Sequence, residues 1–140
     1  MFVDGERKLV RFNLGNGRYQ LYSVSHKDTG LNLWAQVDEA TGMLYFSGAD
    51  NTLYALTGDT KVPLPGLEDV EVAGKFFIQQ GQLVFSDKHQ RVWLYSLKDH
   101  TRLHVASVEG LFDIDAIDVK SQRLLLSKIV AANKELVVFY

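Results

Sequence analysis

Short apolar runs alternate with polar turns along the chain, and one such unit occurs three times. The segment LYFSGADNTLYAL (Leu44–Leu56) is followed about 40 positions later by LVFSDKHQRVWLYSL (Leu83–Leu97), and a third copy begins with LLLSK at Leu124. Each copy has an apolar run that ends in Ser, a polar turn and a second apolar run. No segment keeps apolar residues at helical spacing, so the pattern predicts an all-β protein.

A repeat of this length with four short strands is typical of a β-propeller blade. We name the strands of a blade A to D, from the central channel outward. The chain then holds about three and a half four-stranded blades, beginning with a B strand and ending with a C strand. The expected strands are Met1–Asp4, Lys8–Asn13, Arg18–Val24, Leu33–Asp38, Met43–Ser47, Thr52–Thr57, Lys61–Leu64, Phe76–Gln80, Gln82–Ser86, Arg91–Leu97, Arg102–Ala106, Asp113–Val119, Arg123–Ser127 and Glu135–Phe139.

The residue types agree with this assignment. The B strands read LYF, LVF and LLL, apolar throughout, as expected for a sheet that is packed on both faces by its neighbours. Pro63 lacks an N–H group and suits an outermost D strand. The basic residues Arg18, Lys61 and Arg102 take the same place after the C–D turns. A simple β-sandwich would show alternation of apolar and polar residues in every strand, so it ranks second as a fold.

The blade count is below that of an ordinary closed propeller, so the repeats would form a fragment or an open arc. An open arc exposes apolar sheet faces at its ends. We therefore expect residues 1–140 to be a single propeller-like domain of a longer chain, or copies to self-associate through their open blade edges.

Composition excludes several classes of function. The 15 Lys and Arg against 17 Asp and Glu give a net charge of −2, so we expect no direct nucleic-acid binding. Cysteine is absent, which removes disulfides and thiolate chemistry but leaves the compartment open. The opening MFVDGERKLVRF is too charged for a signal peptide, and no apolar run is long enough to span a membrane.

The C–D hairpins LGNGRYQL, TGDTKVPL and KDHTRLHV resemble those of TolB-type propellers, with a turn, a basic residue and an apolar strand. The style of the repeat is also similar to the periplasmic sensor propellers of CadC-type membrane-bound winged-helix transcriptional regulators. These resemblances imply a non-catalytic binding domain in the periplasm, with a cytoplasmic location as the alternative. The DNA-binding domain and membrane helix of the CadC type are not in this sequence.

LYFSGADNTLYAL followed by TGDTK also resembles a quinoprotein repeat. That family's following Trp is missing, and Pro63 and Leu64 stand in that region. The neighbouring units do not keep the motif. The likeness therefore indicates a common blade design, and we expect no quinone or other cofactor.

Three kinds of polar residue are candidates for site chemistry. DIDAID (Asp113–Asp118) has three carboxylates but lacks the Gly and distal Glu of a calcium loop, so no metal site is expected. The histidines fall in separate turns and strands, which argues against a zinc pair. Serine recurs in register at the ends of B strands, which favours turn hydrogen bonding over a nucleophile. These residues are His26, His89, His100 and His104, and Ser47, Ser86 and Ser127.

The leading hypothesis is a non-enzymatic propeller that binds a protein, peptide or small-molecule ligand, including the case of a regulator's sensor domain. The alternatives are an envelope scaffold or assembly protein, and a fragment of a propeller enzyme of quinoprotein or hydrolase type. We expect the binding face to carry the D–A and B–C connections, because these vary most between units. Its candidate residues are His89, Phe112 and Asp113. The connections are Ser25–Asn32, Pro65–Gly74, Ala106–Phe112, Gly48–Asn51 and Asp87–Gln90.

Overall fold

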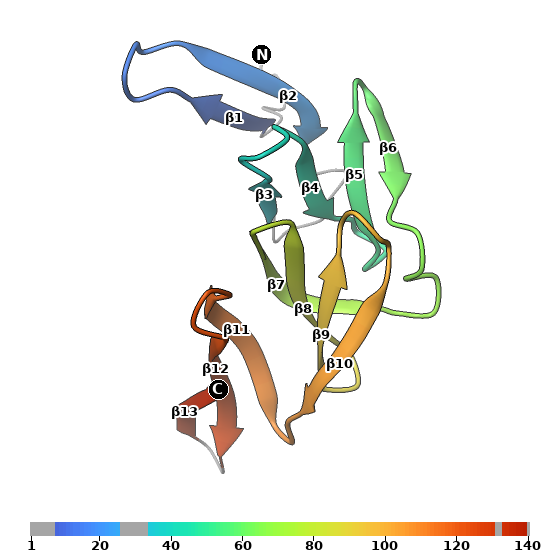
Figure 1. Ribbon diagram of the computed structural model, residues 1–140, viewed down its shortest axis with the longest axis vertical. Coiled ribbons are helices and arrows are strands. Elements are labelled where there is room, and N and C mark those ends of the chain that lie inside the picture. Colours follow the sequence, from blue (N-terminus) through green and yellow to red (C-terminus); the bar gives the residue numbers. More distant parts are fainter. Residues whose placement is uncertain (1–7, 26–33, 131–132, 140) are drawn as a thin grey trace, which may run out of the picture.

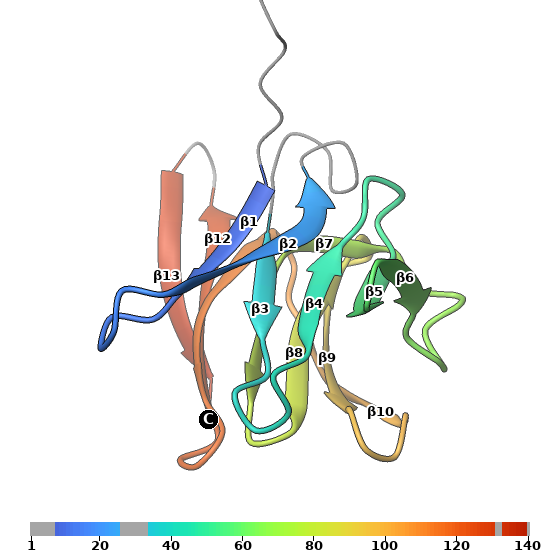
Figure 2. The same cartoon turned by 90° about the horizontal axis from the view of Figure 1, so that it is seen from above.

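The protein is built of antiparallel β-sheets that follow one another along a curve (Figure 1), and Figure 2 shows the same sheets from above. The structure is a computed structural model and describes residues 8–25, 34–130 and 133–139. Within these residues every element is a strand, which confirms the all-β prediction. The strand predicted at Met1–Asp4 and nearly all of the loop Ser25–Asn32, His26 included, lie outside the described residues.

Each sheet is an up-and-down meander whose strands follow chain order. The first is a hairpin, the second and third have four strands each, and the fourth has three described strands. In order, the sheets contain β1 (Lys8–Phe12) and β2 (Tyr19–Ser25); β3 (Ala35–Val37), β4 (Leu44–Ser47), β5 (Leu53–Thr57) and β6 (Thr60–Pro63); β7 (Val72–Gln79), β8 (Gln82–Asp87), β9 (Arg91–Ser96) and β10 (Arg102–Ser107); and β11 (Leu111–Asp118), β12 (Arg123–Val130) and β13 (Asn133–Phe139).

The two most similar sequence segments take the same place in successive sheets. Leu44–Leu56 forms the hairpin β4–β5, and Leu83–Leu97 covers the hairpin β8–β9. Their registers agree as well, because Phe46 pairs with Tyr54 and Phe85 pairs with Trp93. The internal repeat is therefore a structural repeat, as predicted.

The core lies between the sheets, in one apolar cluster at each junction. Phe46, Phe85 and Leu126 are 1%, 0% and 0% exposed and confirm the predicted core. Each belongs to the cluster that joins its sheet to the preceding one. Burying a side chain of this size contributes about 1.5–3 kcal/mol, so the junctions hold the successive sheets together.

One predicted equivalence is wrong. Arg18 closes the first outer hairpin, because its carbonyl accepts the Asn13 N–H at 2.8 Å. The equivalent closing residues are Thr60 and Thr101. One step further into each sheet the pairs are Phe12–Tyr19, Leu56–Lys61 and Tyr95–Arg102. Lys61 and Arg102 do share a position, but Tyr19 takes the place that the sequence suggested for Arg18, because the bond from the Asn13 N–H puts Arg18 itself in the closing pair.

Two inner strands begin earlier than predicted. β7 starts at Val72 because the chain continues through a bulge at Gly74, whose φ is +73°. Glycine adopts this left-handed conformation without a steric penalty. β11 starts at Leu111, again with a register shift, so Phe112 lies in a strand and not in the connection.

Candidate functional site

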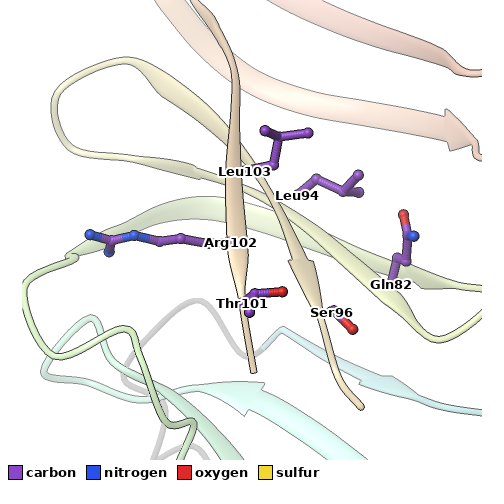
Figure 3. Close-up of a pocket in the computed structure, with 6 residues that line it drawn as sticks. All are labelled: Gln82, Leu94, Ser96, Thr101, Arg102 and Leu103. Carbon is purple, nitrogen blue, oxygen red and sulfur yellow. The ribbon is translucent and has the colours of Figure 1, made fainter. Parts of the chain in front are cut away.

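Two adjoining hollows form a groove beside the outer part of the third sheet. The larger has a volume of about 380 Å³ and lies between the third and fourth sheets; the smaller, of about 190 Å³, lies at the end of the β9–β10 hairpin (Figure 3). They share Gln82, Leu94 and Leu103. The larger is also lined by Val84, Val105, Ile117, Asp118, Val119, Gln122, Arg123 and Leu124, and the smaller by Ser96, Thr101 and Arg102.

The floor of this groove is apolar because one face of the third sheet turns toward the fourth. Leu94 and Leu103 are cross-strand partners on β9 and β10 and lie side by side (Figure 3). Leu103 is 62% exposed and Val105 is 44% exposed, although both belong to a strand. Apolar side chains that stay accessible beside a hollow are typical of binding surfaces.

The opposite wall is the turn between β11 and β12, which a hydrogen bond with the third sheet holds in place. The side-chain oxygen of Gln79 accepts the N–H of Val119, and so ties this turn to the end of β7. Asp118 caps the same turn: hydrogen bonds from the Ser121 side chain and backbone lower the pKa of Asp118. The wall therefore presents a carboxylate near neutral pH.

The outermost strand of the third sheet has a free edge, since β10 pairs only with β9 among the described residues. Ser96 N–H donates to the Thr101 carbonyl at 2.9 Å. By antiparallel alternation, the backbone groups of Arg102 and His104 then point away from β9. In β6 the position of His104 is taken by Pro63, opposite Tyr54, so that edge lacks a donor there. Edge strands with intact donors accept a further strand.

The other face of β9 and β10 is closed by internal bonds. Figure 3 shows Arg102 directed away from Leu103, and its guanidinium forms two 2.8 Å hydrogen bonds with the Asp69 carboxylate. The guanidinium also lies 4.7 Å from the centroid of the Trp93 ring. Lys61 stacks on Tyr54 in the same way, at 4.8 Å, in the second sheet. Lys61 and Arg102 thus make the same contact at the same position of the repeat.

Asp87 organises the turn between β8 and β9. It is 3% exposed and accepts hydrogen bonds from the backbone of His89 and Arg91, from the Arg91 side chain and from the indole of Trp93. Burial alone would raise the pKa of this carboxyl, but the hydrogen bonds from Trp93, Arg91 and His89 outweigh it and lower the pKa. Asp87 therefore holds the turn as a carboxylate.

The three residues predicted from sequence lie near the opposite end of the sheets. His89 is exposed in the β8–β9 turn, and its N–H donates to Asp87. Phe112 is 54% exposed on β11. Asp113 joins two sheets, because its Oδ1 accepts the N–H groups of Lys75 at 2.9 Å and Ile114 at 2.8 Å. None of the three is among the described residues that line the two hollows.

The backbone shows that the predicted face and the groove are at opposite ends. At the predicted face, the Val72 N–H donates to Asn51 O and the Val108 N–H to Gln90 O, so each β-turn is tied to the next connection. At the groove end, the Leu97 N–H donates to Gly81 O. The groove had no sequence signal of its own, because its residues come from five strands and the β11–β12 turn.

Two of the three recurrent serines, Ser86 and Ser127, form hydrogen bonds across strands and not within turns. Ser86 Oγ donates to the Ala73 carbonyl at 2.8 Å, and Ser127 Oγ donates to the Asp113 carbonyl at 3.5 Å. Both bonds reach the neighbouring inner strand at its bulge. Among the described residues, no group of three or more His, Cys, Asp or Glu side chains is placed to hold a metal ion.

Comparison of the sequence with protein-family models and with curated proteins found no match. Within the part of the chain that the structure describes, no helix is long and apolar enough to cross a membrane.

Proposed function

We propose that this chain is part of a β-propeller that binds an extended segment of a protein or peptide without catalysing a reaction. The groove between the third and fourth sheets carries the proposal. Its apolar floor at Leu94, Leu103 and Val105 would take apolar side chains, and the polar groups at its rim would orient them.

The free edge of β10 favours a peptide over a compact small molecule. A peptide added beside β10 would meet the backbone groups of Arg102 and His104, and alternate side chains would enter the groove beside Leu103. The second sheet has no matching edge, because Pro63 removes the donor. The third sheet is thus the better acceptor of the two.

The propeller assignment rests on the recurring sheet order and on junctions that repeat residue by residue. A sensor domain of a membrane-bound transcriptional regulator, exposed to the periplasm, is the narrower form of the proposal and follows the TolB-type and CadC-type resemblance. Fractionation of cells that express the full gene tests the compartment.

A peptide selection tests the binding function. Peptides selected from a random displayed library on the immobilised chain are measured for affinity by fluorescence polarisation. We expect Leu103→Glu to weaken binding about tenfold or more, roughly 1.4 kcal/mol. Val62→Glu is the matched control, since Val62 occupies the same repeat position in the second sheet. Failure to select any peptide, or equal losses in both variants, would contradict the proposal.

A further inference from the structure

One face of the first hairpin is apolar and accessible. Val10, Phe12, Tyr19 and Leu21 are 52%, 56%, 70% and 59% exposed. They form the cross-strand pairs Val10–Leu21 and Phe12–Tyr19, so all of them share one face. The other face carries Leu9, Tyr22 and Val24, which pack on the second sheet.

The equivalent positions in the second and third sheets show what this face would contact. Counted from the pair that closes each outer hairpin, Val10 and Phe12 occupy the positions of Trp93 and Tyr95 on β9. Trp93 and Tyr95 pack in the cluster between the third sheet and the second. In β5 the same positions are held by Tyr54 and Leu56, which pack toward the first hairpin. The exposed face of β1 and β2 therefore has the positions that elsewhere meet a preceding sheet.

The fourth sheet presents the complementary kind of face. Tyr45 and Val84 point from the second strands of their sheets toward the following sheet, and each is buried in that junction. Leu125 has the same position in β12 and lies outside the cluster that joins the fourth sheet to the third. By alternation Ile129, which is 52% exposed, shares its face. Among the residues that the structure describes, one accessible face of each kind is thus left, at the two ends of the curve in Figure 1.

We propose that these two faces bind each other between copies of the chain, head to tail. The Val10, Phe12, Tyr19 and Leu21 face of one copy packs on the Leu125 and Ile129 face of a second copy. This contact continues the junction already seen between successive sheets, where apolar positions of the same kind meet. Because the two surfaces differ, the interface is heterologous, and it extends or closes with further copies. The inference does not depend on the groove or on its ligand.

Single-face variants test the arrangement. Sedimentation and light scattering of the chain are expected to give a mass that rises with concentration to multiples of the monomer. Phe12→Lys and Ile129→Lys each block one face, so each variant alone stays monomeric. An equimolar mixture forms a 1:1 complex, because it retains one intact face of each kind. Val62→Lys, at an accessible apolar site on β6 of the second sheet and outside both faces, is the control and associates like the unchanged chain.

Several outcomes would overturn the proposal. They are a monomer at all concentrations, association of Ile129→Lys alone, or the same loss in the Val62→Lys control. Tyr19→Lys replaces Phe12→Lys if circular dichroism shows that the latter does not fold. Peptide binding by the monomeric Phe12→Lys variant separates this proposal from the proposed function, since the first hairpin contributes none of the described residues that line the groove.

Discussion

The indole N–H of Trp93 donates to Asp87 Oδ2 at 2.8 Å, and this bond ties the third strand of its sheet to the turn before it. The preceding sheet makes the same connection with different residues, because the Tyr54 hydroxyl donates to Asp50. Asp50 lies at a different position of its turn from Asp87, and Gly48 occupies the position in the second sheet that is equivalent to Asp87. A Cβ at Gly48 would lie 2.6 Å from the Tyr54 ring. An aromatic–carboxylate bond is therefore part of the repeat, although no single motif encodes it.

Asp87→Ala should unfold the protein more easily. The substitution removes the shared acceptor of the Trp93 indole and of the Arg91 guanidinium. The Arg91 side chain is 38% exposed and can be rehydrated, so the expected cost is about 1–3 kcal/mol, the usual penalty for a partly buried donor left without a partner. Asp50→Ala is the matched control, because Asp50 is exposed and should cost about 0.5–1.5 kcal/mol. Urea denaturation measures both. Equal losses would show that burial of Asp87 is unimportant.

The same carboxylate predicts a dependence of stability on acid. Its pKa in the folded protein lies below the ordinary value of 3.8, so the unfolded chain binds the proton more readily. The contribution of Asp87 is complete above the unfolded pKa and is lost as the pH falls through the folded pKa. In an Asp87→Asn variant, the stability difference from the unchanged protein should therefore shrink below about pH 4. Parallel stability curves between neutral and acid pH would refute this.

Tyr95 predicts a loss of stability in alkali. Burial, with smaller effects of Glu68 and Tyr45, raises its pKa from 10.0 to about 12, and its hydroxyl donates to the Pro65 carbonyl at 2.6 Å. The raised folded pKa means that this stabilisation is complete below pH 10 and disappears as the pH rises to about 12. Tyr95→Phe should cost about 0.5–1.5 kcal/mol at neutral pH. We expect this difference to vanish in denaturation experiments near pH 12; a constant difference would contradict the assignment.

Alanine substitutions at Gly74 and Gly81 distinguish the cost of backbone strain from the cost of a clash with a neighbouring side chain. Both have φ of +73°, but a Cβ at Gly74 would lie 2.5 Å from Asp113 Oδ1, whereas Gly81 has nothing within 4 Å. Alanine at either position introduces the same backbone strain. Gly74→Ala should cost about 1–3 kcal/mol more, the usual penalty of overpacking. Thermal denaturation compares the two variants. Equal midpoints would mean that the Asp113 side chain moves away from the added methyl group at no cost in stability.

The apolar runs alone were enough to predict most of the strands and the order of the sheets. LYF and LVF are buried from both sides in their sheets, whereas Leu126 is the fully buried residue of LLL, and runs of this kind are visible in the sequence. Pro63 correctly predicted an outermost strand, because a missing N–H is tolerated only at an edge. The repeat length then placed Phe46, Phe85 and Leu126 at equivalent buried positions.

Only the tertiary structure determined the features that bring together residues from different strands or sheets. The first outer hairpin closes at Arg18 because the Arg18 carbonyl is the group that accepts the Asn13 N–H. The types of the turn residues do not determine which backbone groups pair. The sequence made Asp113 a candidate for the variable face, but it did not show that the Asp113 carboxylate accepts the backbone N–H of Lys75, 38 positions away. The groove beside Leu103 exists because β10 and the β11–β12 turn converge without filling the space between them. Local sequence determines strands and turns through hydrogen bonding and burial, whereas grooves and end faces arise only when the packed sheets leave surfaces uncovered.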